Sequence, residues 1–241
     1  MPTEVRSSPD VAVLIVAAGR GQRAGSGLPK QYRPIGDTPV LRRTIGLFEA
    51  HPRIGAILTV IHPDDRALYE PCATGFAKLL APCTGAASRQ GSCLAGLRAL
   101  ADTAPPIVLI HDAARPFASA ALVDRAIDAA YRHGAAVPGL GVTDTVKVVD
   151  ESGLVTQTPV RSGLRTVQTP QAFRYDLVRG AHEQAAAAGL DALTDDGAVV
   201  EWAGQALHVF EGEGSNVKLT TPADFEAAET LVSPLARLGR G

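Results

Sequence analysis

Short apolar runs alternate with amphipathic segments along the first 140 residues. The apolar runs, which predict strands, are Val11–Val16, Ile54–Ile61, Ile107–His111 and Ala135–Pro138. The segments between them have helical spacing and cover Pro39–Ala50, Ser88–Ala101 and Ala121–Tyr131. This alternation predicts βαβ units, and continuously apolar strands predict a mostly parallel sheet flanked by helices on both faces. We therefore expect a Rossmann-like α/β fold that binds ligands beyond the carboxyl ends of its strands.

The pattern changes to period two after residue 142. Thr143–Asp150 and Leu154–Thr158 alternate around the turn residues Glu151-Ser152-Gly153, which predicts a protruding β-hairpin arm at about residues 143–160. A hairpin without helical cover is only marginally stable in water. It therefore either packs on a partner subunit or simply protrudes from the surface, and the sequence leaves both possibilities open.

The last third predicts more helices. The expected elements are a helix over Tyr175–Ala188, a helix capped at Thr194–Asp196, a strand over Ala206–Glu211 and a helix from Thr221 onward. The even spread of apolar segments favours one domain over residues 11–231, with a flexible polar N-terminus at 1–10 and a tail at 232–241.

The first strand leads into a glycine loop rich in positive charge. The residues concerned are Gly19, Gly21 and Gly25, with Arg20, Arg23 and Lys30. Glycines let backbone N–H groups approach a polyphosphate closely, and the basic side chains neutralise it. The loop therefore predicts a nucleoside triphosphate ligand.

Two other interpretations of this loop stay open. Gly19-x-Gly21-x-x-Ala24 formally fits a dinucleotide-binding fingerprint, and a glycine turn can also be purely structural. The fingerprint requires an immediate helix and an acidic residue at the end of the next strand, roughly 20 positions later. Here Gly27 and Pro29 interrupt any helix, and Asp37 lies in a turn. Both features disfavour a nicotinamide-dependent oxidoreductase.

Composition narrows the class of protein. The net charge of −2 and the pI near 6.3 give no global basic field, so we expect no nucleic-acid partner and a local phosphate site. Only four of the 23 basic residues are lysines, and Lys30 and Lys218 stand beside loop-forming residues where a compact charge can meet a phosphate. Each can equally be a solvated surface lysine.

The three cysteines show no paired spacing, which argues against a disulfide framework or a structural zinc site. We expect a cytoplasmic location for the chain. No apolar run approaches membrane-spanning length, so we expect no membrane partner.

Asp112 follows the strand that begins at Ile107. A carboxylate at the end of a parallel strand, facing a triphosphate loop, suits Mg²⁺, although another divalent cation is possible. The alternatives are that Asp112 caps the next turn and that His111 is a packed core imidazole.

Ser88 and Arg89 begin a predicted helix, where they can form an anion or base site or simply cap the helix with a solvated arginine. No convincing nucleophile and base pair is present. If the group that attacks the bound nucleotide is itself a phosphate monoester, its second pKa is near 6. It is then already ionised at neutral pH and needs no general base.

In order along the chain, these segments resemble the 2-C-methyl-D-erythritol 4-phosphate cytidylyltransferase family of the non-mevalonate isoprenoid pathway. The matching stretches are Ala17-Ala18-Gly19-x-Gly21-x-Arg23, Pro29-Lys30-Gln31, Arg89-x-x-Ser92, His111–Pro116, Asp144–Lys147, Arg161, Thr169-Pro170-Gln171 and Asn216-Val217-Lys218. The resemblance covers the chain from Val11 to about Leu231.

The resemblance implies a nucleotidyltransferase-type fold and the transfer of a cytidylyl group from CTP to methylerythritol phosphate. The implied CTP-binding residues are Ala17, Ala18, Gly19, Gly21, Arg89, Ser92 and Asp112, the last also binding magnesium. The residues implied to stabilise the transition state are Arg23, Lys30 and Lys218. The acceptor phosphate would be held by Arg115, Thr145, Arg161 and Thr169, some of them reaching across a homodimer through the hairpin arm.

One stretch departs from the family pattern. The family usually has a Gly-Gly pair and an acidic residue before Arg89, where this chain has Gly85-Ala86-Ala87-Ser88. This chain therefore has no acidic side chain in that stretch. The alternatives are a ribitol-5-phosphate cytidylyltransferase, a sugar-phosphate nucleotidyltransferase for another base, and a non-catalytic nucleotide-binding protein.

Overall fold

The computed structural model describes residues 10–20 and 27–233. Its centre is an eight-stranded sheet in the order β10-β7-β11-β6-β1-β4-β5, with β12 also paired to β7. The strands are β1 (Val11–Ala17), β4 (Ala56–Ile61), β5 (Cys83–Thr84), β6 (Ile107–Asp112), β7 (Ala135–Gly141), β10 (Arg165–Val167), β11 (Gln171–Arg174) and β12 (His208–Glu211). The β1, β4, β5 and β6 strands are parallel to one another, as is β12 to β7, whereas β10 and β11 are antiparallel to their neighbours. The prediction of a mostly parallel sheet is confirmed.

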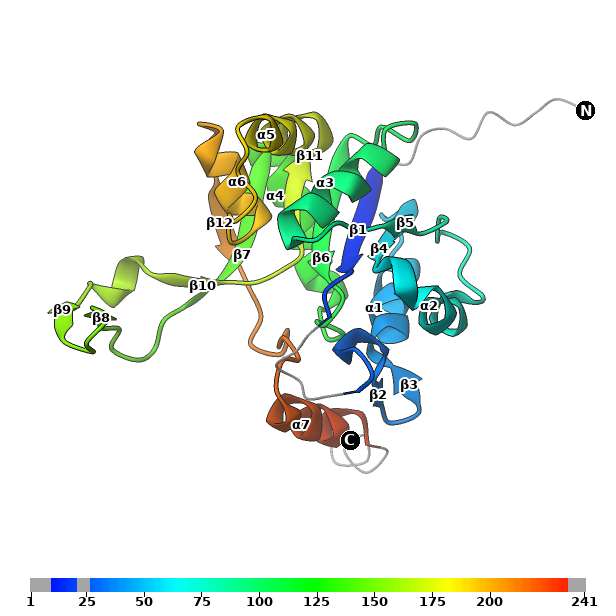
Figure 1. Ribbon diagram of the computed structural model, residues 1–241, viewed down its shortest axis with the longest axis horizontal. Helices are drawn as coiled ribbons and strands as arrows, with labels where there is room; N and C mark the ends of the chain where they lie inside the picture. The colour runs from blue at the N-terminus through cyan, green and yellow to red at the C-terminus, as the bar shows by residue number, and fades with distance from the viewer. Residues whose placement is uncertain (1–9, 21–26, 234–241) are drawn as a thin grey trace, which may run out of the picture.

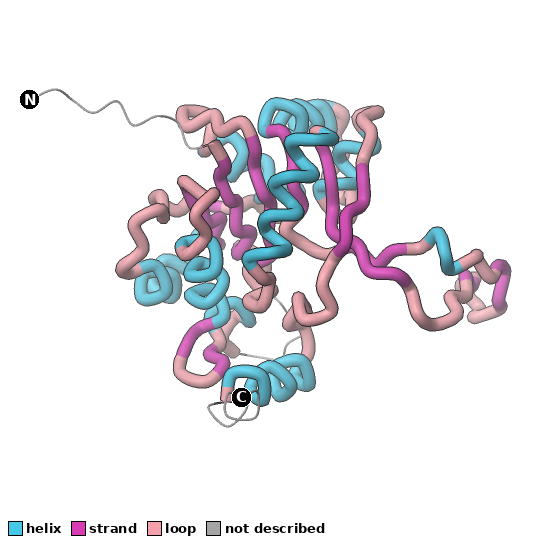
Figure 2. Tube along the Cα trace, turned by 180° about the vertical axis from the view of Figure 1, so that it is seen from behind, coloured by secondary structure: helices cyan, strands magenta, loops and turns pink. Residues whose placement is uncertain are grey.

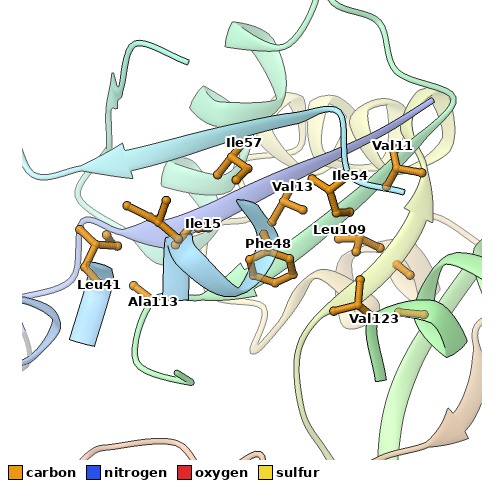
Figure 3. Close-up of a cluster of buried hydrophobic side chains, with 14 of the residues drawn as sticks. Val11, Val13, Ile15, Leu41, Phe48, Ile54, Ile57, Leu109, Ala113 and Val123 are labelled. Carbon is orange, nitrogen blue, oxygen red and sulfur yellow. The ribbon is translucent and has the colours of Figure 1, made fainter. Parts of the chain in front are cut away.

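Helices cover both faces of the sheet (Figure 1). They are α1 (Val40–Glu49), α2 (Arg66–Ala73), α3 (Arg89–Ala99), α4 (Ala120–His133), α5 (Tyr175–Ala187), α6 (Asp196–Trp202) and α7 (Pro222–Val232). Alternate residues of β1 enter two different apolar clusters. Val13 packs with Phe48 of α1 and Val123 of α4 (Figure 3), while Leu14 packs on the face covered by α3, α5 and α6. Burial on both faces explains why the strand sequences are continuously apolar.

The register brings the carboxyl ends of three strands together. Val16 of β1 lies opposite Asp112 of β6, and Ala17 lies opposite Ile61 of β4. The loop after β1 therefore starts beside the carboxylate that ends β6. This edge of the sheet is where an α/β fold binds its ligand.

An arm formed by residues 142–164 projects from the sheet between β7 and β10 (Figures 1 and 2). Its stem is the antiparallel pairing of Gly141 with Arg165, and its outer part contains the small hairpin of β8 (Val148–Val149) and β9 (Val155–Gln157). The short 3-10 helix η4 (Arg161–Gly163) follows. The hairpin predicted here is present, but its paired strands are much shorter than the period-two pattern suggested.

The smaller elements lie beside the sheet. A two-stranded pairing of β2 (Pro34–Ile35) with β3 (Thr38–Pro39) packs against α7, and the 3-10 helices η2 (Lys30–Tyr32) and η3 (Pro63–Asp65) follow β1 and β4. Ile35 and Leu219 share an apolar cluster with Phe225 of α7. Among the described residues, no helix combines the length and apolar character needed to cross a membrane.

Several predicted boundaries shift, and some elements were missed. The second strand begins at Ala56 rather than Ile54, and the last strand begins at His208 rather than Ala206. The sequence pattern did not predict α2, which contains Pro71, or the antiparallel strands β10 and β11. These two strands have three and four residues, too few to show an apolar pattern.

Candidate active site

The start of the glycine loop, directly after β1, is held in place by Gln31. This buried amide donates hydrogen bonds to the carbonyl oxygens of Ala17 (2.7 Å) and Gly19 (3.0 Å). Because these carbonyls are occupied by one side chain, the start of the loop has a defined path beside Lys30. Gln31 belongs to a stretch that matches the family, but its sequence context predicted no role for it.

Arg20 differs from the expectation that it neutralises a phosphate. Its guanidinium pairs with Asp65 (3.0 Å) and Asp64 (2.9 Å) of η3, and one of its nitrogens lies 2.8 Å from His62 Nδ1. Two carboxylates therefore already balance its charge. Their position some 45 residues away in the sequence hid this pairing.

Asp112 lies between two cations at the end of β6. Its Oδ2 is 2.7 Å from Lys218 Nζ, and its Oδ1 is 3.5 Å from Arg89. Burial alone would raise the pKa of this carboxyl, but the charges of Arg89 and Lys218 outweigh burial and lower the pKa to about 2. Asp112 is therefore an anion at every physiological pH. The alternative that it merely caps the next turn does not account for these pairs.

The segment that leads into α3 packs closely against Ala18, the residue that follows β1. Ser88 is the N-cap and accepts from the N–H of Gly91, as the cap hypothesis predicted, whereas Arg89 is ion-paired rather than solvated. A Cβ on Gly85 would lie 2.4 Å from the Ala18 Cβ, so only glycine permits this approach. Ser92 is buried, and its hydroxyl accepts from the N–H of Ala86.

A second buried carboxylate, Asp196, lies behind Arg89. Asp196 Oδ2 is 2.8 Å from Arg89 Nη2, and Asp196 Oδ1 is 3.0 Å from His182 Nε2. Burial by itself would raise the pKa of Asp196, but the charge of Arg89 and the contact with His182 hold it below its ordinary value. The sequence showed Asp196 only as one of several polar residues at a helix start.

His111 is a packed imidazole with both ring nitrogens in use. Its Nε2 lies 3.0 Å from the Arg115 carbonyl, and its Nδ1 lies 3.0 Å from the Thr169 hydroxyl, which also accepts from the N–H of Asp112 (3.1 Å). The carbonyl can only accept, so Nε2 carries the proton and Nδ1 accepts from Thr169. Burial lowers the pKa of His111 to about 4, so the ring stays neutral. The core-imidazole alternative is therefore the better account of His111.

One pocket contains most of the predicted site. Its lining includes eight predicted residues: Ala17, Ala18, Gly19, Lys30, Arg89, Ser92, Asp112 and Lys218. Gln31, Ala86, Ala87 and Ser88 complete much of the wall. Five segments that are far apart in the sequence thus meet at the predicted edge of the sheet.

The predicted acceptor residues fall into two groups. Arg115 and Thr169 lie next to the pocket, where Arg115 donates to the Asn216 carbonyl (2.7 Å) and Thr169 is occupied as described above. Thr145 and Arg161 lie in the arm, and Arg161 donates to the Thr143 carbonyl. The pocket lining includes neither arm residue. Their role toward an acceptor remains a prediction, and Gly21 and Arg23 lie outside the described residues.

The chain is similar to known proteins over most of its length. A bifunctional IspD/IspF enzyme of Nitrobacter winogradskyi is 53% identical over 227 residues, which cover 94% of this chain and 57% of the relative. The corresponding enzyme of Bradyrhizobium diazoefficiens is 52% identical over 228 residues, covering 95% and 56%. The chain thus spans little more than half the length of these curated relatives.

Solved structures match over nearly their whole length. The 4-diphosphocytidyl-2C-methyl-D-erythritol synthase of Anaerococcus prevotii has a TM-score of 0.81 at 31% identity, covering 95% of this chain and 96% of that one. The 2-C-methyl-D-erythritol 4-phosphate cytidylyltransferase of Thermus thermophilus has a TM-score of 0.73 at 36% identity, covering 93% and 98%. The family model IspD, 2-C-methyl-D-erythritol 4-phosphate cytidylyltransferase, matches residues 11–234. The fold, the pocket and these matches together show that the chain belongs to the IspD family.

Proposed function

We propose that this chain transfers the cytidylyl group of CTP to 2-C-methyl-D-erythritol 4-phosphate, giving 4-diphosphocytidyl-2-C-methyl-D-erythritol and pyrophosphate. The family assignment supports this reaction. The observation that carries the proposal is the convergence of Lys30, Lys218, Arg89 and Asp112 beside the glycine loop in one pocket. The cytoplasmic location expected from the cysteine pattern belongs to the same proposal.

The reaction requires positioning and charge neutralisation more than proton transfer. An oxygen of the acceptor phosphate forms a bond to the α-phosphorus of CTP, and the bond from that phosphorus to the bridging oxygen of the β-phosphate breaks. The electron pair leaves with pyrophosphate. The acceptor is a phosphate monoester that is largely dianionic at neutral pH, so no base has to remove a proton. His111 agrees with this scheme, because both of its nitrogens are bonded within the fold.

Lys30 and Lys218 are placed to stabilise the charge that develops on the phosphates. Both line the pocket, and Lys218 is tied to Asp112. A cation that binds the transition state more strongly than bound CTP raises turnover rather than affinity. We assign this role to both lysines, and Arg23 keeps the same role as a prediction.

Asp112 fits the way Mg²⁺ is held by proteins that bind nucleotides. Mg²⁺ usually takes one or two carboxylates and fills its remaining positions with phosphate oxygens and water. Asp112 is an ionised hard-oxygen ligand in the pocket, while no group of three or more acidic, histidine or cysteine side chains suited to a metal occurs in residues 10–20 and 27–233. Asp112 would thus hold the ion together with CTP. When bound, the ion would neutralise phosphate charge.

We also propose that the chain forms a homodimer through the arm. Val149 and Val155, a cross-strand pair in the arm, are 54% and 49% exposed. Apolar side chains on an uncovered two-stranded hairpin are stabilised when another surface covers them. A partner subunit seated there would bring Thr145 and Arg161 toward a neighbouring pocket.

The test is pyrophosphate release from CTP with two acceptors in parallel, methylerythritol 4-phosphate and ribitol 5-phosphate. Control reactions omit the acceptor or contain EDTA. We expect release only with methylerythritol 4-phosphate and only with a divalent cation. Release only with ribitol 5-phosphate would reassign the acceptor. CTP binding without release for either acceptor would instead support a non-catalytic nucleotide-binding protein.

A further inference from the structure

A chain of contacts behind the pocket runs from His182 through Asp196 to Arg89. It joins α5, α6 and α3, which pack on one face of the sheet (Figure 1). We propose that Asp196, supported by His182, is a positioning residue that holds the Arg89 guanidinium in the orientation in which it binds CTP. This inference rests on the proposed function and adds residues outside the predicted site.

Arg89 stands between two carboxylates at unequal distances. Its Nη2 is 2.8 Å from Asp196 Oδ2, but its contacts with Asp112 Oδ1 are both 3.5 Å. The Asp196 side chain is fully buried, whereas that of Asp112 is 13% exposed. An ion pair is stronger when it is shorter and less solvated. Asp196 is therefore the nearer and more deeply buried counterion of Arg89, and it fixes the position of Nη2.

The opposite side of Arg89 is open to the ligand. Its side chain is 30% exposed and lines the pocket with Ser92. A guanidinium is planar, so fixing Nη2 beside Asp196 limits how far the rest of the group can move within the pocket. Anchoring from behind thus reduces the conformational freedom that Arg89 would lose when a nucleotide binds.

His182 completes the anchor by occupying the second oxygen of Asp196. Its Nε2 lies 3.0 Å from Oδ1, and because a carboxylate only accepts, Nε2 carries the proton. Each oxygen of Asp196 therefore lies within ion-pair distance of its own basic side chain. His182 is 1% exposed, so its ring is held in place by the surrounding helices.

Loss of the Asp196 charge has a specific consequence. The other carboxylate in contact with Arg89 is Asp112, which also pairs with Lys218. Without its buried counterion, Arg89 is drawn toward Asp112 and competes with Lys218. The effect falls first on nucleotide binding, since the guanidinium leaves the orientation that faces the pocket.

The test is Asp196→Asn, which keeps the shape of the side chain and removes its charge. We expect the CTP dissociation constant and the KM for CTP to rise about tenfold, with kcat and the KM for the acceptor within about threefold of wild type. Asp195→Ala is the matched control. Asp195 caps the same helix through Ala198 and bonds Gln171 rather than Arg89, so its loss should weaken the fold and leave CTP affinity unchanged.

A second pair of variants keeps the test valid if Asp196→Asn does not fold. His182→Gln retains a donor that can reach Asp196, and His182→Leu does not. We expect His182→Leu to raise the CTP dissociation constant about fivefold and His182→Gln to restore much of the wild-type value. Equal affinities for the two variants would contradict a supporting role for His182.

A readout without nucleotide separates this inference from the proposed function. The Nε–H of Arg89, followed by NMR and assigned by its loss in Arg89→Lys, should exchange with water faster in Asp196→Asn than in wild type. Unchanged exchange, or an equal loss of CTP affinity in Asp195→Ala, would overturn the positioning role. Failure of wild type to release pyrophosphate would overturn the proposed function. The exchange measurement would still show whether Asp196 holds the Arg89 guanidinium in place.

Discussion

The pocket and the arm differ in how far the rest of the chain bonds or covers their side chains. In the pocket, three polar groups find partners from another segment of the same chain: Asp112 pairs with Lys218, Arg89 with Asp196, and Gln31 with the carbonyls of Ala17 and Gly19. In the arm, Leu154 and Val160 are 66% and 79% exposed, and Lys147 donates to the Thr158 hydroxyl within the arm itself.

This difference shows which functions a single chain can prepare alone. The pocket is organised before any ligand arrives, because its geometry is fixed by contacts that also hold the sheet and helices together. The exposed apolar side chains of the arm have no such cover within the structure described here. Changes in the pocket should therefore alter chemistry or folding, and changes in the arm should alter association.

Replacing Lys30 by alanine should give the largest effect. A charge matched to the transition state contributes mainly to turnover, so we expect kcat to fall about 10³-fold, about 4 kcal/mol, with CTP affinity within a few fold. Steady-state kinetics and calorimetry measure the two quantities. Lys78→Ala is the control, because Lys78 bonds the His51 carbonyl away from the pocket. An unchanged kcat would remove Lys30 from the catalytic residues.

Gly85→Ala should destabilise the fold by about 3 kcal/mol, because the added methyl would lie 2.4 Å from the Ala18 Cβ and 2.8 Å from the Ser92 hydroxyl. The comparison variant is Gly153→Ala in the arm, where φ is +87° but no atom lies within 4 Å of the added methyl. We expect it to strain only the hairpin turn and to leave global unfolding in urea unchanged. Similar unfolding midpoints for the two variants would contradict the contrast between pocket and arm.

His111 should make the free energy of unfolding decrease as the pH falls. Its pKa falls from 6.5 to about 4 on folding, so the unfolded chain takes up a proton first as the pH drops. The stabilisation is complete above pH 6.5 and is lost progressively between 6.5 and 4. We expect it to contribute about 2 kcal/mol to the decrease between pH 7.5 and 5.

This sensitivity is measured by urea unfolding in metal-free buffer. His111→Gln keeps a donor for the Arg115 carbonyl but does not titrate over this range. Its stability should therefore change less than that of wild type between the two pH values. Equal decreases would show that the imidazole is not the group that senses acid.

The arm should give the smallest and most selective effect. Replacing Val149 and Val155 by threonine keeps their shape and strand propensity while making the exposed pair polar. We expect the dimer dissociation constant to rise about tenfold by analytical ultracentrifugation, with the unfolding midpoint unchanged. Leu80→Thr, at an exposed apolar residue outside the arm, is the control. A monomeric wild-type chain with full activity would contradict the proposed homodimer.

Sequence alone could predict the part of the fold that depends on local patterns. The continuous apolar run at Val11 and the carboxylate at the end of β6 identify the parallel core and the ligand edge, because burial on both faces leaves a clear signal. By contrast, β11 contains only Gln171–Arg174 and depends on its neighbours for cover. Its position was therefore not predictable from its own residues.

Charged residues show the same limit. Arg20 beside three glycines suggested a phosphate ligand, but its partners come from η3. Asp195 and Asp196 are adjacent and chemically identical, yet one caps α6 and the other pairs with Arg89. Sequence identifies which groups carry charge, while their partners are set by tertiary packing.

The position of β11 between β6 and β7 has a consequence for synthesis on the ribosome. The β6 and β7 strands emerge from the ribosome first. The strand that lies between them in the sheet is completed only at Arg174. A nascent chain that ends before this residue exposes two apolar strand edges with no neighbour. Lys218 emerges later still, so the pocket receives this positive charge only after every strand of the central sheet has been synthesised.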